Sequence, residues 1–174
     1  PKVPTTNFLI LVFQGDKGTG KSFVSKLILK LVDPSRLDVQ TWRGNEKDFA
    51  IAAANAHALC YDNVRWFSPN TSDLLCRAST GSTLSSRQLY SDEEQVIQNV
   101  HVALILNGIH DFISEPDLAD RCLHVHLKRF PEGAQKSEVE LAAELERDLP
   151  QIFRGLLEYT AKILVELPNG QLTK

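Results

Sequence analysis

The sequence predicts a single α/β domain with a mostly parallel central sheet. Short apolar runs alternate with amphipathic helical segments along its 174 residues, and this order builds a sheet that is covered by helices on both faces. The runs are continuous rather than alternating, as is typical of strands buried on both faces. With 43% apolar and 24% charged residues, the composition is that of a globular protein and excludes disorder as the main state.

The expected strands follow the apolar runs in order. A β-hairpin is expected over residues 83–100, where polar and apolar residues alternate loosely around SDEE. A short strand is expected at 37–42. The buried strands are expected at residues 7–14 (NFLILVFQ), 56–61 (AHALCY), 102–106 (VALIL) and 121–127 (RCLHVHL).

The expected helices carry recognisable start and stop signals. Residues 21–32 form an amphipathic helix that Asp33-Pro34 ends, and residues 45–55 begin at Asn45 as the N-cap. A capping box, Ser137-x-x-Glu140, opens residues 137–149, and Pro150 is expected to begin a separate helix. The remaining helices are expected at residues 70–78 and 151–165.

Composition also bounds the function. The net charge is −3, which does not indicate a broad basic surface for nucleic acid. The chain has no apolar run long enough to span a membrane and no signal-peptide pattern, so we expect a cytoplasmic protein that does not contact membranes. Its cysteines, Cys60, Cys76 and Cys122, lack the spacing of a zinc site or a disulfide framework.

We interpret residues 1–174 as one domain, with a core at about 7–130 and a helical C-terminal part at about 135–166. The chain starts at Pro1 and contains no methionine. We therefore expect it to be a piece of a longer protein.

A phosphate-binding motif joins the first strand to the first helix. It reads G-x-x-x-x-G-K-S, the pattern of a P-loop. Glycines let backbone N–H groups turn toward a polyphosphate, and the start of the helix adds its positive end. The motif therefore predicts that ATP is bound by Gly15, Asp16, Lys17, Gly18, Thr19, Gly20, Lys21 and Ser22.

Two residues of this pattern and one strand-end acid have specific expected roles. Lys21 supplies charge for the β- and γ-phosphates, and the Ser22 hydroxyl binds Mg²⁺. Asp62 ends the second buried strand and is the candidate second residue for the metal; the alternative is a turn aspartate. The next residue, Asn63, cannot accept a proton as a general base would, so fast hydrolysis would need a base from elsewhere.

Other polar residues lie where strands begin or end. Asn107 follows VALIL and either orients water near the γ-phosphate or makes an ordinary turn before Gly108. Arg121 begins the last strand, and we expect it near the same sheet edge as the γ-phosphate; the alternative is a structural pair with Asp117 or Asp120. Arg77 and Arg87 are weaker candidates for contact with the γ-phosphate. His124 and His126 share one face of a strand, and without a third ligand we expect them to be packing or surface residues rather than metal ligands.

Over residues 8–130 the chain resembles the ATPase domain of phage and plasmid primase-helicases, which is related to superfamily-three helicases and AAA+ proteins. The segments that carry this resemblance are LLCRASTGSTLSSRQLYSDEE (74–94) and VALILNG (102–108). The resemblance implies a P-loop NTPase three-layer sandwich with Asp62 as the second metal-side acid, Asn107 as the sensor and Arg121 as an inter-subunit arginine finger. It also implies a ring oligomer, commonly a hexamer, that moves on single-stranded DNA or unwinds duplex DNA.

Three functions remain open on the sequence. The first is a Mg²⁺-dependent ATPase that serves mobile-element replication, with Lys21, Asp62, Asn107 and Arg121 as its catalytic residues. The second is a nucleotide-gated regulatory module with weak hydrolysis, which Asn63 favours. The third is a small-molecule kinase, although no arginine-rich lid segment is present. Because Asp92, Glu93 and Glu94 make the expected hairpin tip acidic, DNA contact is expected through flanking domains.

Overall fold

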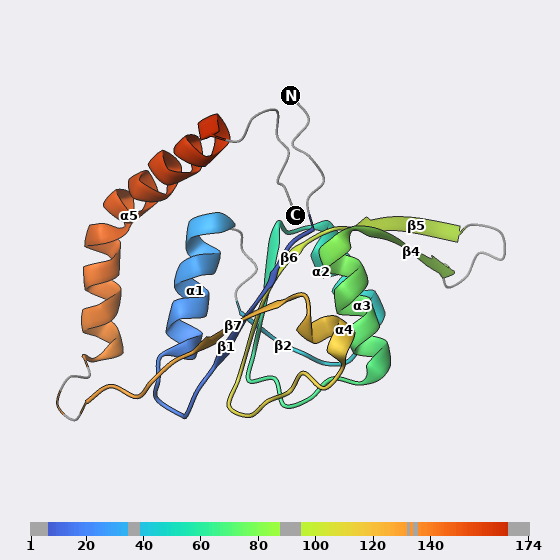
Figure 1. Ribbon diagram of the computed structural model, residues 1–174, viewed down its shortest axis with the longest axis horizontal. Coiled ribbons are helices and arrows are strands. Elements are labelled where there is room, and N and C mark those ends of the chain that lie inside the picture. The colour runs from blue at the N-terminus through green and yellow to red at the C-terminus, as the bar shows by residue number, and fades with distance from the viewer. Residues whose placement is uncertain (1–6, 35–38, 88–94, 132, 134–135, 167–174) are drawn as a thin grey trace. The chain divides into compact units, whose positions relative to one another are not determined.

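The computed structural model describes residues 7–34, 39–87, 95–131, 133 and 136–166 (Figure 1). The chain divides into two compact units. The larger unit comprises Thr6–Arg129, and the smaller unit combines Pro1–Thr5 with Phe130–Lys174.

A five-stranded sheet, parallel throughout, forms the centre of the larger unit (Figure 1), which confirms the expected α/β class. The strand order is β2-β3-β6-β1-β7. The carboxyl ends of all five strands therefore lie on the same side of the sheet, which we call its carboxyl edge, and the opposite side is the amino edge. Strand β6 separates β1 from β3. The strands are β1 (Ile10–Gln14), β2 (Gln40–Thr41), β3 (Ala58–Asp62), β6 (Ala103–Gly108) and β7 (Cys122–His126).

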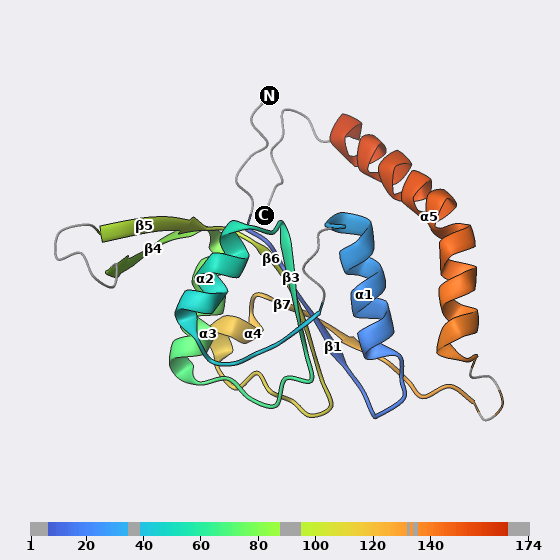
Figure 2. The same cartoon turned by 180° about the vertical axis from the view of Figure 1, so that it is seen from behind.

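Helices cover both faces of this sheet, as Figures 1 and 2 show from opposite sides. On one face, Leu29 of α1 (Lys21–Val32) packs with Phe13, Cys60 and Ile105. On the other face, the side chains of alternate strand residues pack beneath three helices into a larger core that includes Phe49 and Leu75. These helices are α2 (Glu46–Ala54), α3 (Pro69–Thr80) and α4 (Pro116–Ala119).

The ends of α1 and α2 are fixed by the side chains that the sequence indicated. Asp33 ends α1, and its carboxylate accepts hydrogen bonds from the backbone N–H groups of His57 (2.6 Å) and Ala58 (3.1 Å). The Asn45 side chain caps α2 by accepting from the backbone N–H of Lys47 at 3.0 Å. Asp33 thereby joins the end of α1 to the start of β3, on one side of the sheet.

The predicted hairpin is confirmed as a separate two-stranded antiparallel sheet that extends away from the central one (Figure 1). Its strands are β4 (Ser82–Arg87) and β5 (Gln95–Val100). The acidic residues expected at its tip, Asp92, Glu93 and Glu94, lie outside the described residues.

The smaller unit consists, in its described part, mainly of α5 (Glu138–Glu166). The capping box is confirmed, because Ser137 Oγ accepts from the Glu140 N–H at 3.2 Å and the Glu140 carboxylate accepts from the Ser137 N–H at 2.9 Å. The prediction that Pro150 begins a new helix is wrong, since α5 continues through it. Proline inside a helix bends it rather than always ending it, and α5 is visibly bent (Figure 1).

Side chains on α5 leave much apolar surface exposed, with Phe153 44% and Leu157 53% accessible. The helix also carries many charged residues, and none of the helices in the described ranges is long and apolar enough to cross a membrane.

Candidate functional site

The loop between β1 and α1, hereafter the cradle loop (residues 15–20), begins at a glycine that no other residue could replace without strain. Gly15 has φ +153°, and a Cβ there would lie 2.5 Å from the Leu127 carbonyl oxygen and 3.0 Å from Thr19 Oγ1. The Leu127 N–H donates to the Gln14 carbonyl at 2.8 Å, which holds the chain after β7 against this turn. The loop therefore leaves β1 in a conformation that requires glycine.

The end of the cradle loop presents the start of α1 without a side-chain cap. Gly18 and Gly20 both have φ +84°, and Gly20 is the N-cap of α1. Among the described residues, no capping side chain accepts a hydrogen bond from the first N–H groups of this helix. Uncapped N–H groups at the positive end of a twelve-residue helix form a favourable environment for an anion.

Lys21 is folded into the cradle loop. Its Nζ donates to the carbonyl oxygens of Gly15 and Asp16, both at 2.7 Å, and the residue is only 9% exposed. Thr19, also buried, donates from Oγ1 to the Asp16 carbonyl at 2.9 Å. On the outer side, Arg129 donates to the Lys17 carbonyl at 3.5 Å. The lysine charge is thus held by two backbone carbonyl oxygens of the loop, beside the N-terminus of α1.

Ser22 and Asp62 are the candidate ligands for Mg²⁺. Ser22 is in the first turn of α1, and Asp62 is the last residue of β3, half-buried at the carboxyl edge of the sheet. One hydroxyl and one carboxylate suit Mg²⁺, which keeps several waters and takes its other ligands from the phosphates of the substrate. Across the described ranges, no cluster of three or more His, Cys, Asp or Glu side chains could hold a metal without such phosphates.

Asn107 lies near the end of β6, between β1 and β3, and is completely buried. Its side-chain oxygen accepts from the Asn63 N–H at 3.0 Å, and its side-chain nitrogen donates to Ser25 Oγ at 3.2 Å. The Val64 N–H also donates to the Asn107 carbonyl at 2.8 Å. Asn107 therefore connects α1 to the segment after β3, and its amide is already engaged in this conformation.

Arg121 lies at the opposite edge of the sheet from the cradle loop, so the expectation that it shares an edge with the phosphates is corrected. Its carbonyl accepts from the Ile10 N–H at 2.9 Å, where β1 and β7 begin. Parallel strands start at one edge and end at the other, which puts roughly 13 Å between Arg121 and the end of β1. The guanidinium is 3.7 Å from Asp117.

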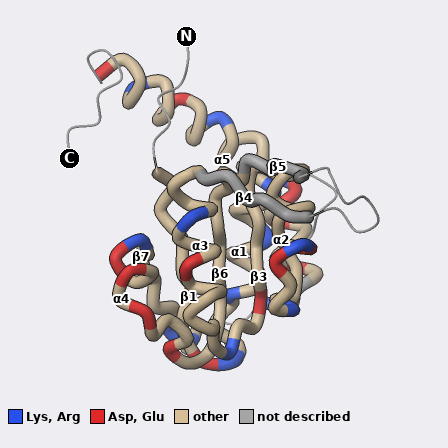
Figure 3. The backbone as a smooth tube through the Cα atoms, turned by 90° about the vertical axis from the view of Figure 1, so that its right-hand side faces the viewer, with Lys and Arg blue, Asp and Glu red and all other residues tan. Residues whose placement is uncertain are grey.

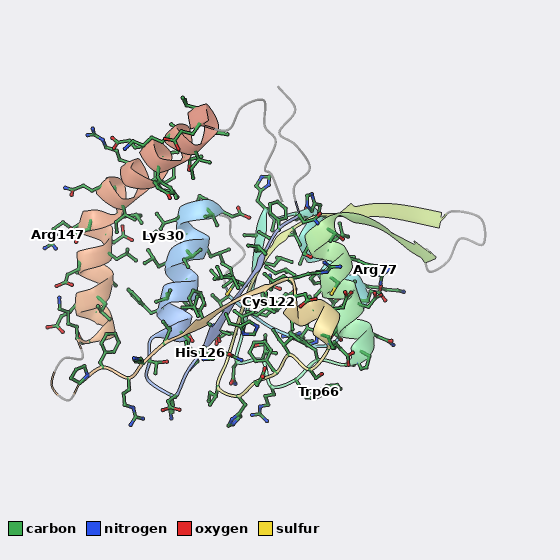
Figure 4. All side chains as sticks on the ribbon, in the orientation of Figure 1. Lys30, Trp66, Arg77, Cys122, His126 and Arg147 are labelled. Atoms are coloured by element: carbon green, nitrogen blue, oxygen red, sulfur yellow. The ribbon has the colours of Figure 1, made fainter. Side chains whose placement is uncertain are left out.

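The weaker arginine and histidine candidates take structural or surface positions where the structure describes them. Arg77 on α3 (Figure 4) forms ion pairs with Asp73 at 3.1 Å and Glu46 at 3.5 Å, so it has a structural role. The side chain of Arg87 lies outside the described part of the chain. His124 and His126 are exposed on β7, in agreement with a surface position.

A small polar network beside the cradle loop was missed by the sequence analysis. Gln14, buried at the end of β1, donates to Asp111 Oδ1 at 3.4 Å, and its oxygen lies 3.4 Å from His124 Nδ1. Asp111 also accepts from the Ile113 N–H at 3.3 Å. The available signal was a glutamine at the last position of an otherwise apolar strand, which predicts a buried side chain with polar partners.

Comparison with known proteins gives a family match that spans nearly the whole chain. The family model described as "Actinomycete integrative conjugative element replication protein" matches residues 1–169 of the 174-residue chain. No curated protein matches the chain.

Proposed function

The chain belongs to the family of actinomycete integrative conjugative element replication proteins, and on this premise we propose that its larger unit binds MgATP and hydrolyses it during replication of the element. The family supplies the biological process, namely replication of a mobile element. ATP binding and hydrolysis are inferred from the residues at the carboxyl edge of the sheet.

The cradle loop is the observation that carries this proposal. It combines a glycine turn that a Cβ would obstruct, an uncapped twelve-residue helix and a lysine held at their meeting point. Each element favours an anion, and together they supply the donors and the positive charge that a polyphosphate needs. An apolar or cationic ligand would leave the uncapped N–H groups at the start of α1 without acceptors.

We propose the following roles for the residues of the site. On ATP binding, Lys21 Nζ leaves the carbonyls of Gly15 and Asp16 and contacts the β- and γ-phosphates, while the loop N–H groups donate to the phosphate oxygens. Ser22 and Asp62 hold Mg²⁺, which neutralises charge that develops on the phosphates. Asn107 positions the segment after β3 through Asn63, and so keeps Asp62 in register with α1.

Hydrolysis in this proposal depends on assembly. Arg121 is too far from its own cradle loop to stabilise the γ-phosphate there, so it would serve a neighbouring subunit in a ring, as the family resemblance implies. We propose that this ring is a hexamer and that it translocates on DNA.

A nucleotide-gated regulatory module is the second candidate, and one observation favours it. Asn63 follows Asp62 directly and has φ +55°, a left-handed conformation that asparagine tolerates better than glutamate does. The backbone at position 63 therefore suits asparagine better than it suits a glutamate that could act as the general base. If this second function holds, the larger unit binds ATP, changes its contacts with other proteins in response, and hydrolyses the ATP only slowly. Transfer of phosphate to a small acceptor would instead support a kinase.

The test is a pair of substitutions at the carboxyl edge. Lys21→Ala should weaken MgATP binding about tenfold or more, measured by titration calorimetry, because it removes a charge-assisted contact. Lys26→Ala, an exposed lysine on the same helix, is the matched control and should bind normally. Asp62→Ala should abolish Mg²⁺-dependent turnover while the circular dichroism spectrum stays unchanged. Unaltered affinity in Lys21→Ala would refute the proposed nucleotide site.

A further inference from the structure

A surface pocket of about 510 Å³ opens at the carboxyl edge of the sheet, beyond β3 and β2. It lies between the loop from β2 to α2 and the loop from β3 to α3. The first loop contributes Trp42 and Arg43 to its wall, and the second contributes Asn63, Arg65 and Trp66. The cradle loop follows β1, which is separated from β3 by β6, so this pocket is distinct from the phosphate site.

The charge of the pocket is positive. Arg43 and Arg65 are both exposed, and neither forms an ion pair with any residue in the described ranges. No carboxylate of a described residue lines the pocket. The helices α2 and α3 begin at its rim, where Asn45 and Ser68 cap them and where α2 carries Glu46 and Asp48 in its first turn, so the positive charge of the wall comes from the two arginines. Basic and acidic residues are interspersed along the backbone of the larger unit (Figure 3).

The pocket also combines a fixed aromatic wall with a free aromatic side chain. Trp42 packs edge-on against Tyr61 at 5.2 Å and Phe67 at 5.9 Å between ring centroids, which holds it in place. Trp66, in contrast, is 68% exposed and lies among the loops at the carboxyl edge (Figure 4). An indole left in water next to two unpaired guanidinium groups is well suited to a ligand with flat rings and negative charge.

We propose that this pocket binds single-stranded DNA, with a base stacked on Trp66 and the neighbouring phosphates on Arg43 and Arg65. The choice of DNA rests on the replication role in the proposed function, and the location rests on the pocket. Unpaired bases offer a free face for stacking, whereas duplex bases do not. Alternating phosphates and bases match two arginines placed around one indole. Because Asn63 is both in the pocket wall and adjacent to Asp62, bound DNA would lie next to the proposed metal-side acid.

Binding of a fluorescein-labelled oligothymidylate, measured by anisotropy without any nucleotide, tests this site. Trp66→Ala should weaken binding about tenfold or more through lost stacking, and Trp66→Phe should retain most of it. Arg43→Ala and Arg65→Ala should each lower the slope of log affinity against log salt by about 0.7. Tyr159→Ala and Arg154→Ala, exposed residues of α5, are the matched controls and should bind as the unmodified chain does.

Several outcomes would overturn the inference: no binding by the unmodified chain, equal losses in the control variants, unchanged binding in all pocket variants, or tighter binding of a duplex of the same length. All variants change exposed side chains, and their melting curves verify folding. Lys21→Ala should bind the oligothymidylate normally. A failure of the ATP proposal would therefore be visible in calorimetry alone, and a failure of the DNA proposal in anisotropy alone.

Discussion

The two edges of the central sheet differ in the kind of chemistry that they offer. At the carboxyl edge, β1 and β3 end in Gln14 and Asp62, and Asn107 is the last residue but one of β6. The loops beyond them carry glycines and an open pocket, and the buried Lys21 begins α1 there. At the amino edge, strands begin among packed residues, and Arg121 is paired with Asp117. Because each loop after a parallel strand is free of the core, polar groups can converge there without disturbing packing.

One strand, β7, shows the difference within a few residues. Its first residues follow Arg121 at the amino edge, whereas Leu127, just beyond its end, contacts Gly15 through a backbone oxygen. A residue before a strand and a residue after it are therefore on opposite sides of the domain. Within one subunit, substitutions at the carboxyl edge should alter nucleotide binding, and substitutions at the amino edge should not.

The largest expected effect concerns Arg121, which lies at the amino edge of its own subunit and is proposed to act at the carboxyl edge of a neighbouring one. Arg121→Ala should leave MgATP affinity unchanged but lower turnover by about 10³- to 10⁵-fold, if the arginine stabilises a neighbour's γ-phosphate. Turnover is measured by phosphate release, and affinity by calorimetry.

Mixing experiments separate this role from a structural one. Lys21→Ala subunits should bind ATP poorly but carry an intact Arg121, so adding them to Arg121→Ala subunits should restore part of the turnover. No recovery at any ratio, with oligomers verified by sedimentation, would leave Arg121 as the partner of Asp117 alone, worth about 0–1 kcal/mol.

A second substitution tests whether the carboxyl edge lacks a base. Asn63→Glu should raise turnover by about 10²- to 10⁴-fold if the missing carboxylate limits hydrolysis. The positive φ at this position will cost some stability, so Asn63→Asp, which tolerates that backbone better, is the companion variant. Unchanged turnover in both variants would mean that another residue already activates water, or that the unit is a regulatory module.

A smaller effect is expected from the turn at the start of the cradle loop. Gly15→Ala should destabilise the domain by about 1–3 kcal/mol and weaken MgATP binding, because its Cβ would meet the Leu127 oxygen. Gly44→Ala is the control: φ is also positive there, at +73°, but nothing lies within 4 Å of the added carbon. Thermal unfolding of the two variants therefore separates the collision from backbone strain. Equal losses would contradict the role assigned to Leu127.

The smallest effect concerns a thiol at the amino edge. Burial raises the pKa of Cys122 to about 12, and its Sγ donates to the Leu118 carbonyl at 3.1 Å. A raised pKa lowers the thiolate fraction, which at pH 8 is about 10⁻⁴ compared with about one quarter for a free thiol of pKa 8.5. Alkylation of Cys122 by iodoacetamide, followed by mass spectrometry, should be slow at pH 8 and become fast only when the chain unfolds. Rapid labelling of Cys122 in the folded chain would show that solvent and reagent reach this thiol, and would contradict its burial.

Much of the fold was predictable because its signals are local. The helix at 21–32 and the caps Asn45 and Asp33 were predicted at the residues where they occur, since apolar periodicity and capping depend on near neighbours. The strands were predicted because short, continuous apolar runs are typical of strands that are buried on both faces of a parallel sheet. Pro150 was misjudged because its local preference for a helix start is also compatible with a bend inside a longer helix.

The site was only partly predictable. The cradle loop is contiguous in sequence, so its pattern could be recognised directly. The position of Arg121 depends on strand direction, and the Asn107 contacts with Ser25 and Asn63 depend on strand order. The pocket proposed for DNA combines residues of two loops, near 43 and near 65, and no periodicity relates them. Such features become visible only when the sheet is assembled.

Lys21, the first residue of α1, neutralises backbone carbonyl oxygens of the cradle loop in the structure. Its two hydrogen bonds, both 2.7 Å long, give the carbonyl oxygens of Gly15 and Asp16 a charged donor. The proposed binding of ATP would then exchange one set of Lys21 contacts for another, and the affinity would be the difference in free energy between the two sets. Removing Lys21 would therefore lower the melting temperature of the empty domain as well as its affinity for ATP.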